Sequence, residues 1–234
     1  MTAPTTTTIS VRGDAQRTVA PDQAQIYTTV VRIGGSRTEA TAAARQAAAE
    51  LLRALADLGG VALTLETLRA PLAWSVPSMN THEDWDKSGP GPTGRHVCEL
   101  TLQVLARDFD VLAAVTERLT GSEFTRVNSV HWSVDDDNAT WALVRADAIE
   151  AALRKGDDYA AALGGSVISV EHVADAGLLG GDQTGGFRPE RAAAFSLTSG
   201  SRSPDDLTLD PVPQVLRAVI DARFTATIGA LPGR

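Results

Sequence analysis

The chain has 234 residues, of which 43% are hydrophobic, so it can bury a sizeable core without disulfides or a structural metal. Its 29 acidic and 21 basic side chains give a net charge of -8, which opposes non-specific attraction to nucleic acid or to an anionic membrane surface. The single cysteine, Cys98, excludes an intramolecular disulfide and any multi-cysteine metal site.

Two strands open the predicted fold. Residues 9–16 and 24–31 alternate apolar and polar side chains, which is the pattern of a strand with one buried face. Pro21 and Asp22 lie between these stretches, and both residue types favour turns. We therefore expect two successive strands joined by a short turn.

A long helix is predicted next. Ser36-Arg-Thr-Glu39 has the spacing of a capping box, in which the serine hydroxyl and the glutamate carboxylate satisfy free amide groups at a helix start. Gly59-Gly60 predicts that the helix ends near Leu58. Apolar residues recur at steps of three or four, and we expect this face to pack on a sheet: Ala40, Ala44, Ala47, Leu51, Leu55 and Leu58.

The middle of the chain combines a weak strand pattern with a polar stretch. Residues 63–76 favour a third strand, although Pro71 interrupts its alternation. Residues 77–94 are rich in Pro, Gly and polar side chains, a composition that predicts a long exposed loop. Alternation resumes over residues 96–104, which predicts another strand.

Two further helices are expected. The first is short and has four residues on one side: Phe109, Leu112, Thr116 and Leu119. Gly121 ends this helix, and a strand over 124–134 follows it. Asp135 to Asn138 then supplies an N-cap and negative charge to the next helix, which ends at Gly164-Gly165. Its predicted buried stripe is Ala142, Ala146, Ile149, Leu153, Gly156, Ala160 and Leu163.

The last part of the chain predicts two strands separated by an irregular stretch. Residues 167–173 favour a strand, and residues 174–211 are too long and too rich in Gly, Ser, Pro and Asp for a tight connection. Alternation from Leu216 to Ile228 predicts a long final strand with one face in solvent.

The predicted order is ββαββαβαββ, which indicates an α+β fold of largely antiparallel sheet with long helices packed on one face. Helices and strands alternate too irregularly for a doubly wound nucleotide fold. We expect a single domain over residues 1–234, or two lobes, with flexible loops near residues 77–94 and 174–211.

One short stretch contains several side chains that can bind metal ions. His82, Glu83, Asp84 and Asp86 place an imidazole and three carboxylates within five residues, a set that could hold a divalent ion. A loop does not preorganise such ligands, so a solvated acidic loop is the favoured interpretation. Asp135 to Asp137 are similarly explained by helix capping.

The histidines and the cysteine do not form a recognisable motif. His82, His96, His131 and His172 are scattered without the i, i+4 spacing of a helical zinc pair, and structural roles are favoured for them. Cys98 alternates with leucines on an apolar strand face, which favours a buried and inert thiol.

No catalytic or cofactor-binding residues are predicted. The chain lacks a Gly-x-Ser-x-Gly elbow, and the glycine-rich stretch 177–186 lacks the Lys-Ser/Thr ending of a phosphate-binding loop. The tryptophans are not interleaved with Lys or Arg as on a platform for single-stranded nucleic acid. Trp74 and Trp85 flank or occupy the first predicted loop, where they are candidate interface anchors.

Together these motifs resemble the SIMPL-domain family, which includes bacterial periplasmic and outer-membrane-antigen-like proteins and a mammalian kinase-associated protein. The resemblance rests on the order and spacing of stretches over most of the chain: residues 9–15, 19–24, 38–44, 142–153 and 162–165. It implies an α+β fold, no established enzymatic activity, and ring-like or channel-like oligomers in some relatives. The family contributes no catalytic residues, and residues 80–92 depart from its pattern.

These observations predict a non-enzymatic module for protein association or self-assembly, without a cofactor, acting through the two long loops and exposed strand edges. The alternative is a metal or small-ligand binding protein with a cleft under those loops.

The N-terminus has neither the basic region nor the apolar segment of a secretory signal, and no apolar run approaches the roughly 20 residues of a membrane span. We therefore expect a cytoplasmic homo-oligomer or partner-binding protein without membrane insertion.

Overall fold

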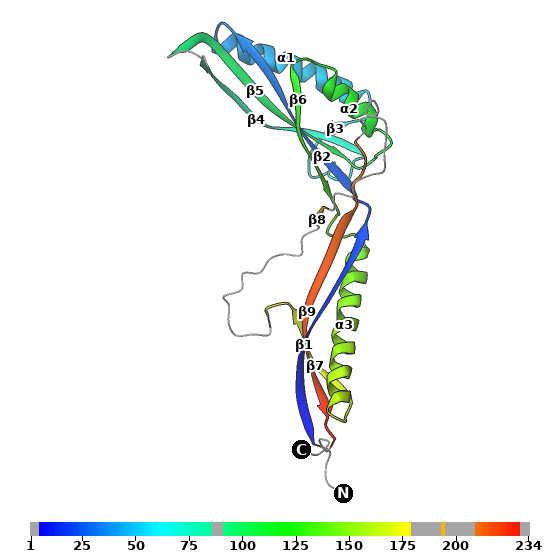
Figure 1. The fold of residues 1–234 in the computed structure, drawn as a ribbon. Coiled ribbons are helices and arrows are strands. Elements are labelled where there is room, and N and C mark those ends of the chain that lie inside the picture. The colour runs from blue at the N-terminus through cyan, green and yellow to red at the C-terminus, as the bar shows by residue number, and fades with distance from the viewer. Residues whose placement is uncertain (1–4, 86–90, 179–192, 195–208, 230–234) are drawn as a thin grey trace, which may run out of the picture. The chain divides into compact units, whose positions relative to one another are not determined.

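The computed structural model describes residues 5–85, 91–178, 193–194 and 209–229 (Figure 1). The chain divides into two compact units, and each has its own sheet. The first unit consists of Met1–Val19, Asp135–Phe195 and Pro213–Arg234, and the second of Ala20–Val134 and Ser196–Val212. None of the helices in the described part of the chain has the length and hydropathy of a membrane-spanning segment.

The first unit is a sheet with one helix on one face. Its central strand β9 lies between β1 and β7, and β1 pairs with β9 in antiparallel register along its whole length. Side chains of β9 alternate between a buried face under α3 and a face turned away from it, as the sequence predicts. The elements are β1 (Thr6–Val19), α3 (Thr140–Ala162), β7 (Val167–Asp175), β8 (Ala193–Ala194) and β9 (Gln214–Thr227).

Helix α3 lies very close to this sheet because its buried residues are small. A Cβ atom built on Gly13 of β1 would lie 2.0 Å from the carbonyl oxygen of Ala148, and one built on Gly156 would lie 2.8 Å from the ring of Phe224. The predicted stripe of α3 is therefore wrong in most of its members. The buried residues are Trp141, Val144, Ala148, Ala152, Gly156 and Ala160. From Ala148 to Ala160 only small side chains are buried, whereas Ile149 is 38% exposed.

The other face of the same sheet is polar. Arg12 of β1 donates two hydrogen bonds to the carboxylate of Asp221 on β9, at 2.7 and 3.1 Å. The amide of Gly177 donates a third, at 2.9 Å. The hydrogen bond from Arg12 is the main reason why the pKa of Asp221 lies below its ordinary value.

The second unit is a five-stranded sheet with strand order β3-β4-β5-β2-β6. All its pairs are antiparallel except that of β3 with β4. Helix α1 packs on β2, β4 and β5, and α2 packs beside it on β6. The elements are β2 (Gln23–Gly34), α1 (Arg37–Ala56), β3 (Val61–Ala62), β4 (Leu72–Trp85), β5 (Pro92–Ala106), α2 (Leu112–Thr120) and β6 (Thr125–Ser133).

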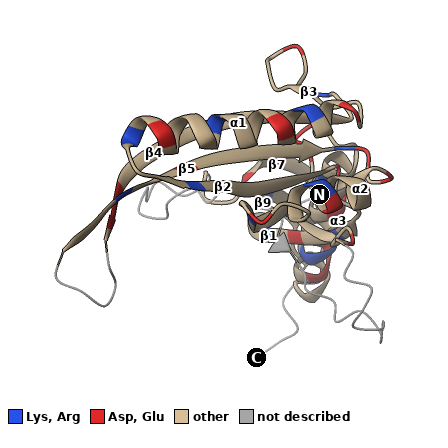
Figure 2. Ribbon diagram, turned by 90° about the horizontal axis from the view of Figure 1, so that it is seen from above, with Lys and Arg blue, Asp and Glu red and all other residues tan. Residues whose placement is uncertain are grey.

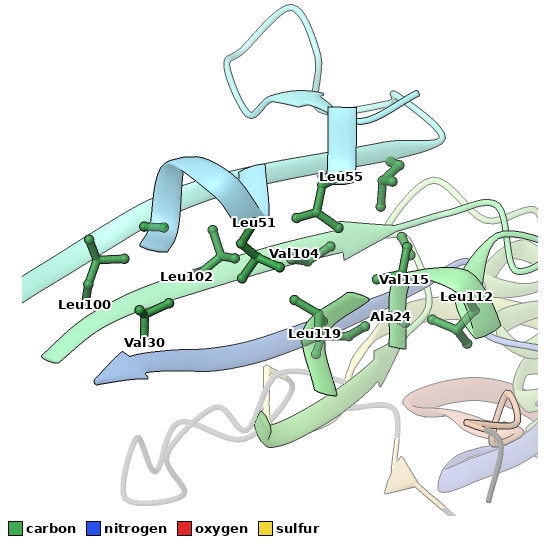
Figure 3. Close-up of a cluster of buried hydrophobic side chains, with 14 residues drawn as sticks. Ala24, Val30, Leu51, Leu55, Leu100, Leu102, Val104, Leu112, Val115 and Leu119 are labelled. Atoms are coloured by element: carbon green, nitrogen blue, oxygen red, sulfur yellow. The ribbon is translucent and has the colours of Figure 1, made fainter. Parts of the chain in front are cut away.

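The core of the second unit lies between the helices and the sheet (Figure 3). Leu51 and Leu55 of α1 meet side chains of β5 such as Leu102, which is fully buried. The predicted capping box at the start of α1 is confirmed. Glu39 donates its amide to Ser36 Oγ at 3.2 Å, and its carboxylate accepts from the amide of Gly35 at 3.0 Å.

The predicted strand over residues 63–76 is confirmed only in its second part. Residues 63–71 are turns and irregular structure, and the strand begins at Leu72. The hydroxyl of Thr67 accepts the amide of Thr64 at 2.7 Å and donates to the carbonyl of Ala62 at 2.6 Å. These local bonds compete with strand pairing and close a turn instead.

The prediction of a long loop over residues 77–94 is also wrong for its described part. Strand β4 continues to Trp85, and β5 begins at Pro92. Pro77 is tolerated because it lies within a register shift between Ser75 and Ser78, where the ladder is already interrupted. Most side chains on this part of β4 are exposed, so the composition resembles that of a loop although the backbone is paired.

Two smaller predictions gain detail. Helix α3 begins at Thr140, whose amide donates to Asn138 Oδ1 at 2.9 Å, so within the predicted stretch Asp135 to Asn138 it is the asparagine that satisfies this amide. Strand β7 extends to Asp175, and most of the predicted irregular stretch 174–211 lies outside the described residues. The element order contains two strands that were not predicted, the two-residue β3 and β8.

Thr28 offers a test of how the core of the second unit is built. This residue of β2 is fully buried, and its hydroxyl has no hydrogen-bond partner within the described residues. Thr28→Val is therefore expected to raise the free energy of unfolding by about 1 kcal/mol, because it removes a buried polar group without changing its shape. Urea denaturation measures this change.

The neighbouring residue is a matched control. Thr29 Oγ1 accepts a hydrogen bond from Asn128 Nδ2 at 2.7 Å, so Thr29→Val should lower the free energy of unfolding. Equal effects of the two substitutions would show that the unpaired hydroxyl of Thr28 is not the cause.

Candidate association site

The outer end of the β4–β5 hairpin extends beyond the rest of its sheet. Strand β2 pairs with β5 only as far as Gly34, which lies opposite His96. Strands β4 and β5 continue together from Glu83 opposite His96 to Trp85 opposite Pro92. Figure 2 shows the two strands running past the end of β2. We call Asp84, Trp85 and residues 92–95 the hairpin end.

The hairpin end has an irregular register that side chains hold in place. Only Asp84 lies between the two paired positions on β4, whereas Thr93, Gly94 and Arg95 lie between them on β5. Gly94 has a φ of 76°, which permits this wide bulge, since other residues rarely adopt such a conformation. Arg95 Nη2 donates to Asp84 Oδ2 at 2.7 Å.

Trp85 is the large apolar side chain of the hairpin end. It is 61% exposed although it belongs to a paired strand. Tryptophan is enriched among the residues that contribute most to protein interfaces, because it buries a large rigid surface. The arrangement presents an aromatic side chain to solvent on an ordered backbone.

Trp74, the other predicted anchor, has a different environment. It lies on β4 opposite Val104 and is packed against the core of the second unit. Its Nε1 atom is buried without a hydrogen-bond partner in the described residues. Its side chain is therefore used in folding, and we retain Trp85 as the interface candidate.

The predicted metal-binding residues are not gathered into a ligand set. Successive residues of a strand point to opposite faces, so His82 and Glu83 diverge. Asp84 accepts the hydrogen bond from Arg95, and Asp86 lies outside the described residues. Among residues 5–85, 91–178, 193–194 and 209–229, no group of three or more His, Cys, Asp or Glu side chains is placed to hold a metal ion.

The remaining histidines and the cysteine lie apart. His131 of β6 contacts the ring of Tyr27 edge to face, with 5.7 Å between the ring centroids, whereas His172 belongs to the other unit. Cys98 is fully buried beside Ala40 and Ala44 of α1, as predicted. Nothing in these positions indicates a reactive thiol.

The strand edges of the first unit carry features that oppose the addition of another strand. Lys155 of α3 donates to the carbonyl oxygen of Arg12 on β1 at 2.8 Å, and its ammonium lies 3.5 Å from Asp14. At the other edge, β7 has two register shifts relative to β9. A lysine at an edge strand and a bulged edge strand both hinder pairing with a further chain.

The edges of the second sheet are similarly irregular. Strand β4 is an edge strand beyond the two residues that pair with β3, and it has the register shift that contains Pro77. Strand β6, at the other edge, has a register shift at Asn128. Proline and bulges hinder strand addition for the same reason. The hairpin end is therefore a better candidate for association than the strand edges that the sequence suggested.

Sequence reasoning identified Trp85 but missed its supporting residues. Thr93 and Arg95 have no recognisable role unless β4 and β5 are known to form a hairpin. The signal that could have found them is the resumption of strand pattern on both sides of the Gly- and Pro-rich residues 88–94.

The comparisons with known proteins give a family but no activity. A family model described as SIMPL, a protein of unknown function (DUF541), matches residues 9–224. The search of curated proteins found no match. The matched residues span both compact units, from β1 to β9. The chain therefore belongs to the SIMPL family.

Proposed function

We propose that this chain is a non-enzymatic protein-association module that assembles with copies of itself through the hairpin end. The observation that carries the proposal is the exposure of Trp85, 61%, at a position where its backbone is paired and a side-chain network holds the neighbouring residues. Burial of this side chain at an interface would remove a large apolar surface from water.

The chemistry of the described residues supports association over catalysis. The hairpin end offers an aromatic side chain, a proline and an ion pair, which suit a protein interface with an apolar centre and a polar rim. The net charge of -8 opposes a polyanionic partner such as nucleic acid.

Trp85→Ala tests the proposal. We expect the dissociation constant for self-association to rise about tenfold or more, since truncation of a central aromatic anchor typically costs about 2 kcal/mol. Sedimentation velocity over a wide concentration series measures this change.

The matched control is Leu65→Ala, which removes an apolar side chain that is 89% exposed in the turns before β4. This variant should associate like the unmodified chain. A protein that stays monomeric over the whole series, or equal weakening by both substitutions, would refute the proposal.

A further inference from the structure

The ladder of β4 and β5 continues to the hairpin end, past the last residue at which a third strand pairs with it. A two-stranded ladder without a third strand or a packed face is only marginally stable in water. Beyond Gly34, strand β2 no longer supports β5, yet the ladder of β4 and β5 continues to Trp85 and Pro92. Interactions other than the sheet must hold this part of the hairpin.

Those interactions converge on Asp84. Its Oδ2 accepts from Arg95 Nη2 at 2.7 Å and lies 3.1 Å from Thr93 Oγ1. The Thr93 hydroxyl also lies 2.9 Å from the carbonyl oxygen of Asp84, and it accepts the amide of Arg95 at 3.3 Å. One carboxylate thus links β4 to both side chains of the bulge on β5. We call Asp84, Thr93 and Arg95 the brace.

We propose that the brace preorganises the hairpin end for association and that Asp84 is a positioning residue for Trp85. Asp84 immediately precedes Trp85, so fixing the carbonyl of Asp84 also fixes the peptide unit from which the side chain of Trp85 projects. This inference rests on the proposed function. Binding through an already ordered side chain avoids the entropic cost of ordering it at the interface.

The brace is poorly suited to stabilising the whole fold. The side chain of Arg95 is 57% exposed and that of Asp84 is 23% exposed, and exposed ion pairs contribute little to global stability. Its effect should therefore be local. A substitution in the brace should therefore weaken association without changing the stability of the whole fold.

Asp84→Asn keeps the shape of the side chain and removes its charge. We expect the dissociation constant for self-association to rise about fivefold, in keeping with the cost of ordering one or two side chains on binding. In the monomer, at concentrations below the dissociation constant, amide hydrogen exchange of residues 82–85 and 93–96 should accelerate, and the thermal unfolding midpoint should stay unchanged. Asp84→Glu, which retains the charge, should recover part of the affinity.

Glu150→Gln is the matched control, because it removes an exposed ion pair, with Arg154 of α3, that is remote in sequence from the hairpin. It should change neither association nor exchange of the hairpin amides. If Trp85→Ala weakens association while Asp84→Asn does not, the brace has no role in binding and the proposed function stands. If the unmodified chain does not associate, both proposals fail.

Discussion

Replacing Gly13 with alanine is expected to lower the free energy of unfolding of the first unit by about 3 kcal/mol. The added Cβ would lie 2.0 Å from the carbonyl oxygen of Ala148 and 2.8 Å from the amide nitrogen of Ala152. Both are backbone atoms of α3, so the helix itself must move away from the sheet. Overpacking of this kind costs about 1 to 3 kcal/mol and sometimes more.

Tryptophan emission offers a local measurement when Trp74, Trp85 and Trp132 are replaced by phenylalanine, because Trp141, which is buried in α3, is then the one tryptophan of the chain. Urea denaturation followed through this signal should show an earlier midpoint for Gly13→Ala. The control is Gly91→Ala, since a Cβ at Gly91 would meet no atom of the described residues within 4 Å. If Gly13→Ala has the same urea midpoint as the unmodified chain, α3 does not lie as close to β1 as described.

Replacing Leu55 with alanine is expected to destabilise the second unit by about 3 kcal/mol. Leu55 is fully buried and contributes to the core beneath α1 (Figure 3). Removing its side chain leaves a cavity between the helix and the sheet, and such substitutions cost about 2 to 5 kcal/mol. Denaturation followed by circular dichroism measures the effect.

The control for Leu55 is a leucine in the other long helix. Leu143 of α3 is 50% exposed, so Leu143→Ala should change the free energy of unfolding much less, by about 1 kcal/mol or below. If the signal of Trp141 also shifts in Leu55→Ala, the two compact units unfold cooperatively. Similar losses in Leu55→Ala and Leu143→Ala would contradict the core described here.

Features that depend only on residues close together in the sequence, such as a helix cap or the alternation along a strand, could be predicted from the sequence. The Ser36 and Glu39 capping box predicted the start of α1, and the alternation along β9 predicted its buried face. The stripe of α3 was not predictable in the same way, because alanines occur on several faces of this helix. The close approach of Gly13 selects the face with the small residues, and that contact is between segments far apart in the sequence.

The amino-acid composition gave a wrong prediction where the backbone is paired but the side chains remain in solvent. The polar residues of β4 after Pro77 resemble a loop, yet their amides and carbonyls belong to the ladder with β5. The candidate site shows the same limit. Trp85 is visible as an aromatic in a polar stretch, whereas the contact of Asp84 with Arg95 depends on a register that only the folded hairpin defines.

The protected strand edges have a consequence for the behaviour of the protein at high concentration. Growth of a cross-β fibril requires a straight strand whose free backbone groups can template the next chain. The contact of Lys155 of α3 with the backbone of β1 and the register shifts of β4, β6 and β7 remove such a template in the native fold. Native seeds for amyloid should therefore be scarce, and fibrillation should require prior unfolding of one of the units.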